Sequence, residues 1–344
     1  MKSIFAIVLT GLALTAQQGY CQKTAVDKEE FFKNETLLKV TIESYWTKLF
    51  NQKNKEGRAF PGRFIAKIND TIEVNEPVNL TVRGHFRRDF CFIPPLKLGF
   101  TKTGDSRMHS LKSIKLVSTC KGNSTYEQYL VKEFVVYKIY NLLTDKSIRT
   151  RFLNVDYKDS NGSKSPFIEP AFFTEDVKDM AKRNKCIEWK KGKLATESTN
   201  RKQMTLVAVF EFMIGNTDWS VPGNHNILLI QSKEDSTSVP FAVPYDFDYS
   251  GLVNTDYAIP DPLLNTEHVQ ERVYRGYPRT MEELNETLQI FLQQKDKIYA
   301  TINNFEPLSA RTKKGMTSYL DEFYKIINNP KDIKYSFIDK ARID

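Results

Sequence analysis

The 344-residue sequence contains little glycine, with 15 residues, and little proline, with 14. These counts exclude a collagen-like chain and argue against a largely disordered one. No HExxH or GxSxG motif is present, so nothing indicates a zinc protease of that type or a serine hydrolase. After the N-terminal segment, no apolar run reaches the roughly 18 residues of a membrane-spanning helix. What the chain does have, 23 Phe and 16 Tyr, predicts a packed core.

The charge balance is basic, with 50 Lys and Arg against 42 Asp and Glu, a net charge of +8. Spread over this length, the excess suits contact with phosphate groups or an anionic surface. The basic residues form neither a dense tail nor an arginine-rich block, so we expect no nucleic-acid partner.

The N-terminus has the composition of a secretory signal peptide. Lys2 supplies a positive start, residues 4–16 are apolar, and small residues offer cleavage sites before Gln17 or Gln22. Such a stretch is too short to span a membrane. We therefore expect residues 1–21 to be removed and the mature protein to be exported, either periplasmic or secreted.

Three further cysteines remain in the expected mature chain: Cys91, Cys120 and Cys186. An exported protein meets oxidising conditions, which favours a disulfide. Cys91 and Cys120 are the preferred pair because each flanks a predicted strand of the same N-terminal sheet. The alternative is three reduced thiols, and the spacing does not resemble a zinc site.

The order of predicted elements changes along the chain. Residues 37–120 are rich in short β-prone runs, 124–143 have helical periodicity, and two strands follow before residue 173. Residues 174–344 are mainly helical around one predicted hairpin, and Thr280 with Glu283 forms a capping-box pattern. We expect an α+β fold with a β-rich N-terminal lobe over residues 37–173 and a helical C-terminal lobe. This is the plan of a bilobal, kinase-like fold.

The first cluster of chemically informative residues is RGHFRRDFCFIPPLKLGF, residues 83–100. Arg83, Arg87 and Arg88 surround Gly84 in a predicted turn, and Lys97 lies in the next strand. Glycine permits close backbone approach to a ligand, and arginine and lysine suit phosphate oxygens. The alternative is a basic surface turn.

The second cluster is IGNTDWSVPGNHNILLI, residues 214–230. Asp218 lies in a loop between an apolar helix and a strand, and Asn226 leads directly into that strand. An Asp, a loop, an Asn and a strand follow in this order in kinase catalytic loops. The alternative is an Asx-rich turn whose side chains satisfy backbone groups.

The third cluster is PYDFDYSGLVN, residues 244–254. Asp246 and Asp248 are two residues apart, so in an extended segment both carboxylates would point the same way. The predicted hairpin would return them beside Asn226, and such oxygen ligands suit Mg²⁺. The alternative is a solvated acidic turn.

These motifs, together with KLV, FFTEDVKDMAKR and a helix carrying Glu133, occur in an order that resembles the spore-coat protein H (CotH) kinase family. The likeness covers residues 80–260, and it is closest to an exported, uncharacterised branch found in Bacteroidetes. It implies a bilobal, atypical protein-kinase-like fold. It also implies an enzyme that transfers the γ-phosphoryl group of ATP to Ser or Thr hydroxyls of a protein substrate, with Mg²⁺ as cofactor.

The resemblance also implies roles for individual residues. Asp218 would be the catalytic carboxylate, and Asn226 with Asp246 or Asp248 would hold Mg²⁺. Arg83 and Gly84 of the turn would help bind the nucleotide. Lys97 would touch its phosphates, and Glu133 would orient Lys97 from the helix. Glu175 would lie at the connection between the lobes, near the adenine edge. The family's Arg-Gly-Asn-Ser turn is RGHF here, without its amide and hydroxyl. A non-catalytic, kinase-like binding or envelope-assembly scaffold is therefore the alternative.

Overall fold

The computed structural model describes residues 25–55, 57–101 and 106–343. Seven strands form a closed barrel in the order β1-β2-β3-β4-β5-β7-β6. Their bounds are β1 Leu38–Ser44, β2 Ala59–Lys67, β3 Glu73–Val82, β4 Leu96–Phe100, β5 Ser113–Ser118, β6 Thr150–Asp159 and β7 Phe167–Thr174. Neighbouring strands are antiparallel except for β1 and β6, which pair in parallel and close the barrel.

Alternating side chains fill the barrel. In β3 every second residue from Val74 to Val82 is buried, the pattern of a strand with one face toward a core. Phe64 is fully buried in that core, with its ring near the rings of Phe100 and Phe173.

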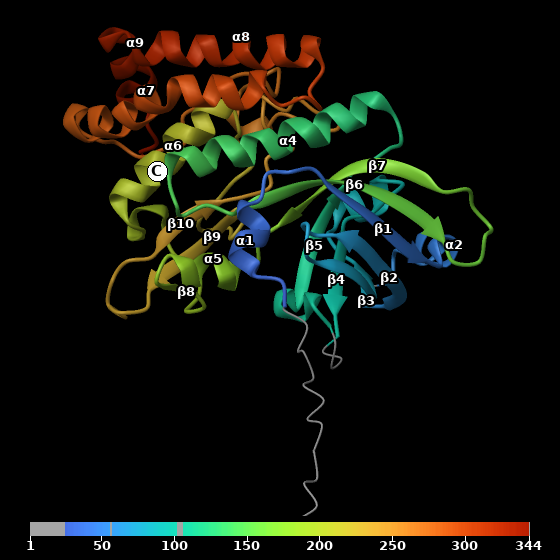
Figure 1. Cartoon of the computed structure of the whole chain (residues 1–344). Coiled ribbons are helices and arrows are strands. Elements are labelled where there is room, and N and C mark those ends of the chain that lie inside the picture. Colours follow the sequence, from blue (N-terminus) through green and yellow to red (C-terminus); the bar gives the residue numbers. More distant parts are fainter. Residues whose placement is uncertain (1–24, 56, 102–105, 344) are drawn as a thin grey trace, which may run out of the picture.

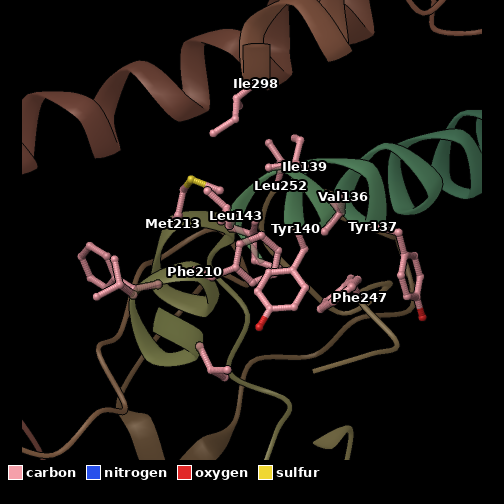
Figure 2. Packing of buried hydrophobic residues seen from close by; sticks show 14 of the residues in the cluster. Val136, Tyr137, Ile139, Tyr140, Leu143, Phe210, Met213, Phe247, Leu252 and Ile298 are labelled. Atoms are coloured by element: carbon pink, nitrogen blue, oxygen red, sulfur yellow. The ribbon is translucent and has the colours of Figure 1, made fainter. Parts of the chain in front are cut away.

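A helical part covers one side of the barrel (Figure 1). Its helices are α4 Ser124–Leu143, α6 Arg201–Ile214, α7 Met281–Asn303, α8 Ala310–Ile327 and α9 Pro330–Lys334, followed by the π-helical turn η4 Tyr335–Asp339. Figure 2 shows α4 side chains such as Ile139 and Tyr140 packed with Phe210 and Met213 of α6 and Ile298 of α7. Every residue of α6 from Gln203 onward is buried, so this helix lies inside the molecule.

Smaller elements connect the two parts. Three short strands, β8 Cys186–Glu188, β9 Ile227–Ser232 and β10 Phe241–Pro244, form a second sheet in the order β10-β9-β8. The short helices are α1 Lys28–Lys33, α2 Trp46–Asn51, α3 Phe86–Phe90, α5 Val177–Arg183, η1 Met108–Leu111, η2 Thr196–Ser198 and η3 Pro262–Leu264. The predicted capping box is confirmed: Thr280 and Glu283 exchange hydrogen bonds at the start of α7.

The expectation of a bilobal, kinase-like fold is wrong. The chain mixes helices and strands, but its N-terminal strands form a closed barrel and not the sheet of a kinase N-terminal lobe. The difference lies in the parallel pairing of β1 with β6, in which Leu38 lies opposite Leu153. Local hydrophobic patterns predict strands, but they do not show which strands pair across such a sequence separation.

The cysteine prediction is confirmed, because Cys91 and Cys120 form a disulfide. Cys186 is a buried free thiol. No helix within the described residues has the length and apolar character needed to cross a membrane. The predicted signal peptide, residues 1–21, lies outside the described residues.

Candidate functional site

The loop after α6 holds Asp218 in a fixed position. Gly215 ends the helix in a left-handed conformation (φ 65°), and the Asn216 side chain accepts a hydrogen bond from the Asp218 amide at 3.0 Å. The Asp218 carboxylate then accepts from His225 Nε2 at 2.8 Å and from Asn226 Nδ2 at 2.9 Å. The structure therefore places Asp218 and Asn226 in contact, across eight residues of sequence.

Asn226 and Asp246 come together at the end of the small sheet. Tyr245 donates its amide hydrogen to the Asn226 carbonyl at 3.0 Å, which continues the pairing of β9 with β10. Both Asn226 (φ 52°) and Asp246 (φ 65°) have left-handed backbone conformations, and Asp246 donates its amide hydrogen to the Tyr137 hydroxyl of α4. Such conformations are uncommon outside glycine and are concentrated at functional sites.

Free acceptor atoms remain at this place. Among the described residues, none donates a hydrogen bond to the Asp246 carboxylate or to the Asn226 side-chain oxygen. The Asn226 side chain donates from its Nδ2 to Asp218. An amide oxygen and a carboxylate are hard ligands of the kind that Mg²⁺ takes, with water completing its shell. The described residues contain no group of three or more His, Cys, Asp or Glu side chains that could hold a metal ion.

Asp248 differs from Asp246, because it is buried and already has partners. Its carboxylate accepts a hydrogen bond from the Tyr257 hydroxyl at 2.9 Å and lies 3.9 Å from Arg87 Nη1. Burial first, and then the Asp246 charge, raise the pKa of Asp248 to about 7, although Arg87 opposes the shift. The turn at Asp246 breaks the extended segment that the sequence suggested, so Asp246 is the better placed of the two to receive a ligand.

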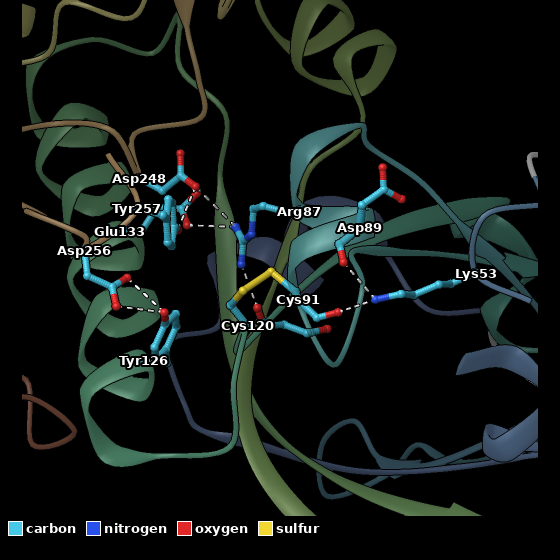
Figure 3. The surroundings of a disulfide bond; sticks show 11 residues. Lys53, Arg87, Asp89, Cys91, Cys120, Tyr126, Glu133, Asp248, Asp256 and Tyr257 are labelled. Carbon is cyan, nitrogen blue, oxygen red and sulfur yellow. Dashed lines mark hydrogen bonds and ion pairs between the residues drawn. A yellow bond between two sulfur atoms is a disulfide. The ribbon is translucent and has the colours of Figure 1, made fainter. Parts of the chain in front are cut away.

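Glu133 is paired with Arg87. Arg87 extends from the short helix α3, brings Nη1 to 3.5 Å from Glu133 Oε2, and donates to the Ser118 carbonyl at 2.8 Å (Figure 3). Burial and the Asp248 charge raise the pKa of Glu133 well above its ordinary value. The sequence placed Arg87 in a basic turn and gave it no partner. The helical periodicity of α4, which places Glu133 on a buried face, was the sequence signal that Glu133 needs a charged partner.

Three cations form the opposite side of the site. Lys97 and Lys115 are directly paired on β4 and β5, on the outer face of the barrel. The Arg83 guanidinium makes no hydrogen bond or ion pair with any described residue, and its Nε is buried. Burial lowers the pKa of Arg83 and of Lys115, and the Asp246 charge acts in the opposite direction on both. Lys115 received no role from the sequence, although it is the lysine of the KLV motif and its strand was recognised.

Gly84 and Glu175 have local structural roles. Gly84 has φ 79°, which a residue with a side chain rarely adopts, and an added Cβ would meet only Pro95 at 3.9 Å. The Glu175 carboxylate, buried after β7, is held by Arg183 Nε at 2.9 Å and by the Arg149 amide at 3.1 Å. Its carboxylate is therefore engaged within the protein.

The site combines an acidic edge, formed by Asp218 and Asp246 with Asn226, and a basic edge that contains Arg83, whose charge interacts with Asp246. A carboxylate that can accept a proton, ligands for a hard cation and unpaired cations for an anion are the components that phosphoryl transfer needs.

No protein-family model and no curated protein matches this sequence. The resemblance to the CotH kinases therefore remains a prediction.

Proposed function

We propose that this protein is an exported, ATP-dependent enzyme that transfers the γ-phosphoryl group to Ser or Thr hydroxyls of a protein substrate. The observation that carries the proposal is the contact of Asp218 with Asn226, beside Asp246, whose carboxylate accepts no hydrogen bond from any described residue. The Cys91–Cys120 disulfide supports export, because such bonds persist in oxidising compartments.

Asp218 would orient the acceptor hydroxyl and take its proton. His225 and Asn226 each hold one of its carboxylate oxygens, which fixes the carboxylate for this task. Asn226 and Asp246 would hold Mg²⁺, which supplies charge neutralisation for the phosphates when bound. Arg83, with Lys97 and Lys115, would bind the phosphate oxygens of the nucleotide.

One observation favours the alternative of a non-catalytic binding or envelope-assembly scaffold. Arg87 engages both Glu133 and Asp248, so neither carboxylate is free for a lysine or a metal ion. A scaffold of this kind would bind neither ATP nor Mg²⁺ at the acidic edge.

The test is the intact mass of the purified mature protein after incubation with ATP and Mg²⁺, together with the ATP consumed. We expect the wild type to gain phosphate or to consume ATP, and Asp218→Asn to do neither. Asp70→Asn is the matched control, because it removes one fully exposed carboxylate far from the site in sequence and should leave activity unchanged. A wild type that does neither, or an Asp218→Asn variant that retains full activity, would refute the proposal.

A further inference from the structure

A cavity of about 410 Å³ lies between α4, β6 and α7. Phe134, Lys138 and Leu142 line it from α4, at the spacing of i, i+4 and i+8 that defines one helix face. Glu133 and Tyr137 belong to another face of the same helix, and that other face contributes to the candidate site. The volume is within the range of pockets that hold small molecules.

Three phenylalanine rings form the apolar wall of this cavity. The Phe134 ring lies 5.0 Å from the Phe152 ring and 5.2 Å from the Phe305 ring, and the latter two are 5.1 Å apart between centroids. Leu142 and Phe305 are only half-buried. Apolar surface at the cavity therefore remains available for an apolar ligand.

The charged residues at the cavity have one prevailing sign. Lys138, Lys297 and Arg151 line it together with a single carboxylate, that of Glu35. Glu35 binds Lys138 at 2.6 Å, but its side chain is 74% exposed, so this pair contributes little. Lys297 is exposed and has no ion-pair partner among the residues described.

One buried hydroxyl among the residues that line the cavity has no hydrogen-bond partner in the described part of the chain. Thr150 lines the cavity, is only 2% exposed, and its Oγ1 has no hydrogen-bond partner. A buried hydroxyl without a partner is uncommon in native proteins, and a water molecule in the cavity beside a bound apolar ligand would satisfy it.

We propose that this cavity binds a small apolar monoanion of the medium-chain fatty-acid class. The apolar body packs against Phe134, Phe152 and Phe305, and the carboxylate lies toward Lys297 and Lys138. The unpaired ammonium of Lys297 favours an anion over a neutral ligand or a cation of the same length. This site is independent of the function proposed above, because it involves none of the residues assigned to phosphoryl transfer.

Calorimetric titration with octanoate, octan-1-ol and octylammonium tests the proposal on the wild-type protein. We expect octanoate to bind most tightly and octylammonium most weakly. Lys297→Glu should weaken octanoate binding by about fivefold or more, the effect of losing one exposed ion pair and adding a repulsion. Lys314→Glu, on the exposed surface of α8, makes the same charge change away from the cavity and should have no effect.

A second variant tests the location. Thr301→Trp adds a large side chain to the α7 wall of the cavity, and it should abolish octanoate binding while the melting temperature shows that the protein is folded. Three results would each overturn the proposal: no octanoate binding by the wild type, equal affinity for octan-1-ol, or unchanged octanoate binding by Lys297→Glu.

Discussion

Removal of the Arg87 side chain should cause a pH-dependent loss of stability. Arg87 Nη1 lies 3.5 Å from Glu133 and 3.9 Å from Asp248, and both carboxylates are less than 10% exposed. Arg87→Met would leave two buried carboxyl groups without their cation. Breaking a buried ion pair in this way costs about 3–5 kcal/mol of unfolding free energy.

The direction of the pH effect follows from the raised pKa values. Carboxylates titrate near pH 4 in the unfolded chain, whereas the pKa of Asp248 is about 7 in the folded protein. Between these values the folded state binds more protons, so stability falls as the pH rises. Arg87 lowers the pKa of both Asp248 and Glu133, so without it the fall becomes larger.

Urea unfolding at pH 5 and pH 8 measures this effect. We expect Arg87→Met to lose about 3–5 kcal/mol at pH 8 and clearly less at pH 5, where more of the carboxyl groups are protonated. Arg88→Met, one residue away on α3, removes a contact with the mainly exposed Asp89 and should cost about 1 kcal/mol or less. Adding Glu133→Gln to Arg87→Met should restore part of the loss at pH 8. Equal losses at both pH values, or a loss no greater than that of Arg88→Met, would contradict this explanation.

Two further predictions concern stability. Cys91→Ser, which removes the disulfide to Cys120 across 29 residues, should lower the unfolding free energy by about 3–4 kcal/mol. A reductant should then leave the urea midpoint of the variant unchanged. A wild type whose urea midpoint does not respond to reductant would argue against the disulfide. Burial raises the pKa of Glu211 to about 8, so the wild type should lose about 1–2 kcal/mol between pH 7 and pH 9 as this group ionises. Glu211→Gln should remove that part of the pH dependence, and parallel pH profiles for the two proteins would show that Glu211 does not titrate in this range.

Local patterns in the sequence predicted several elements well. The run of residues 124–143 forms α4, because its apolar residues have helical spacing and Asn123 caps its first turn. The hairpin between Asn226 and Asp246 forms β9 and β10, and it brings those two residues together. Both features depend on contacts that are close in sequence.

Features that depend on distant contacts were not predictable in the same way. The barrel closes through β1 and β6, which are more than 100 residues apart. The partner of Glu133 is Arg87 from a short helix, and not Lys97, because α3 turns one arginine inward where the sequence suggested only a basic turn. Charge and residue type identified the candidate site residues, but tertiary packing determines which of them are in contact.

Calorimetric titration with ATP, with and without Mg²⁺, tests most directly whether the candidate site binds a nucleotide and a metal ion. We expect the wild type to bind ATP more tightly when Mg²⁺ is present, Asp246→Asn to lose this gain in affinity, and Asp70→Asn to keep it. Arg83→Gln should weaken ATP binding both with and without the metal ion. A wild type that binds no ATP, or an Asp246→Asn variant that retains the full effect of Mg²⁺, would refute the proposed nucleotide and metal site.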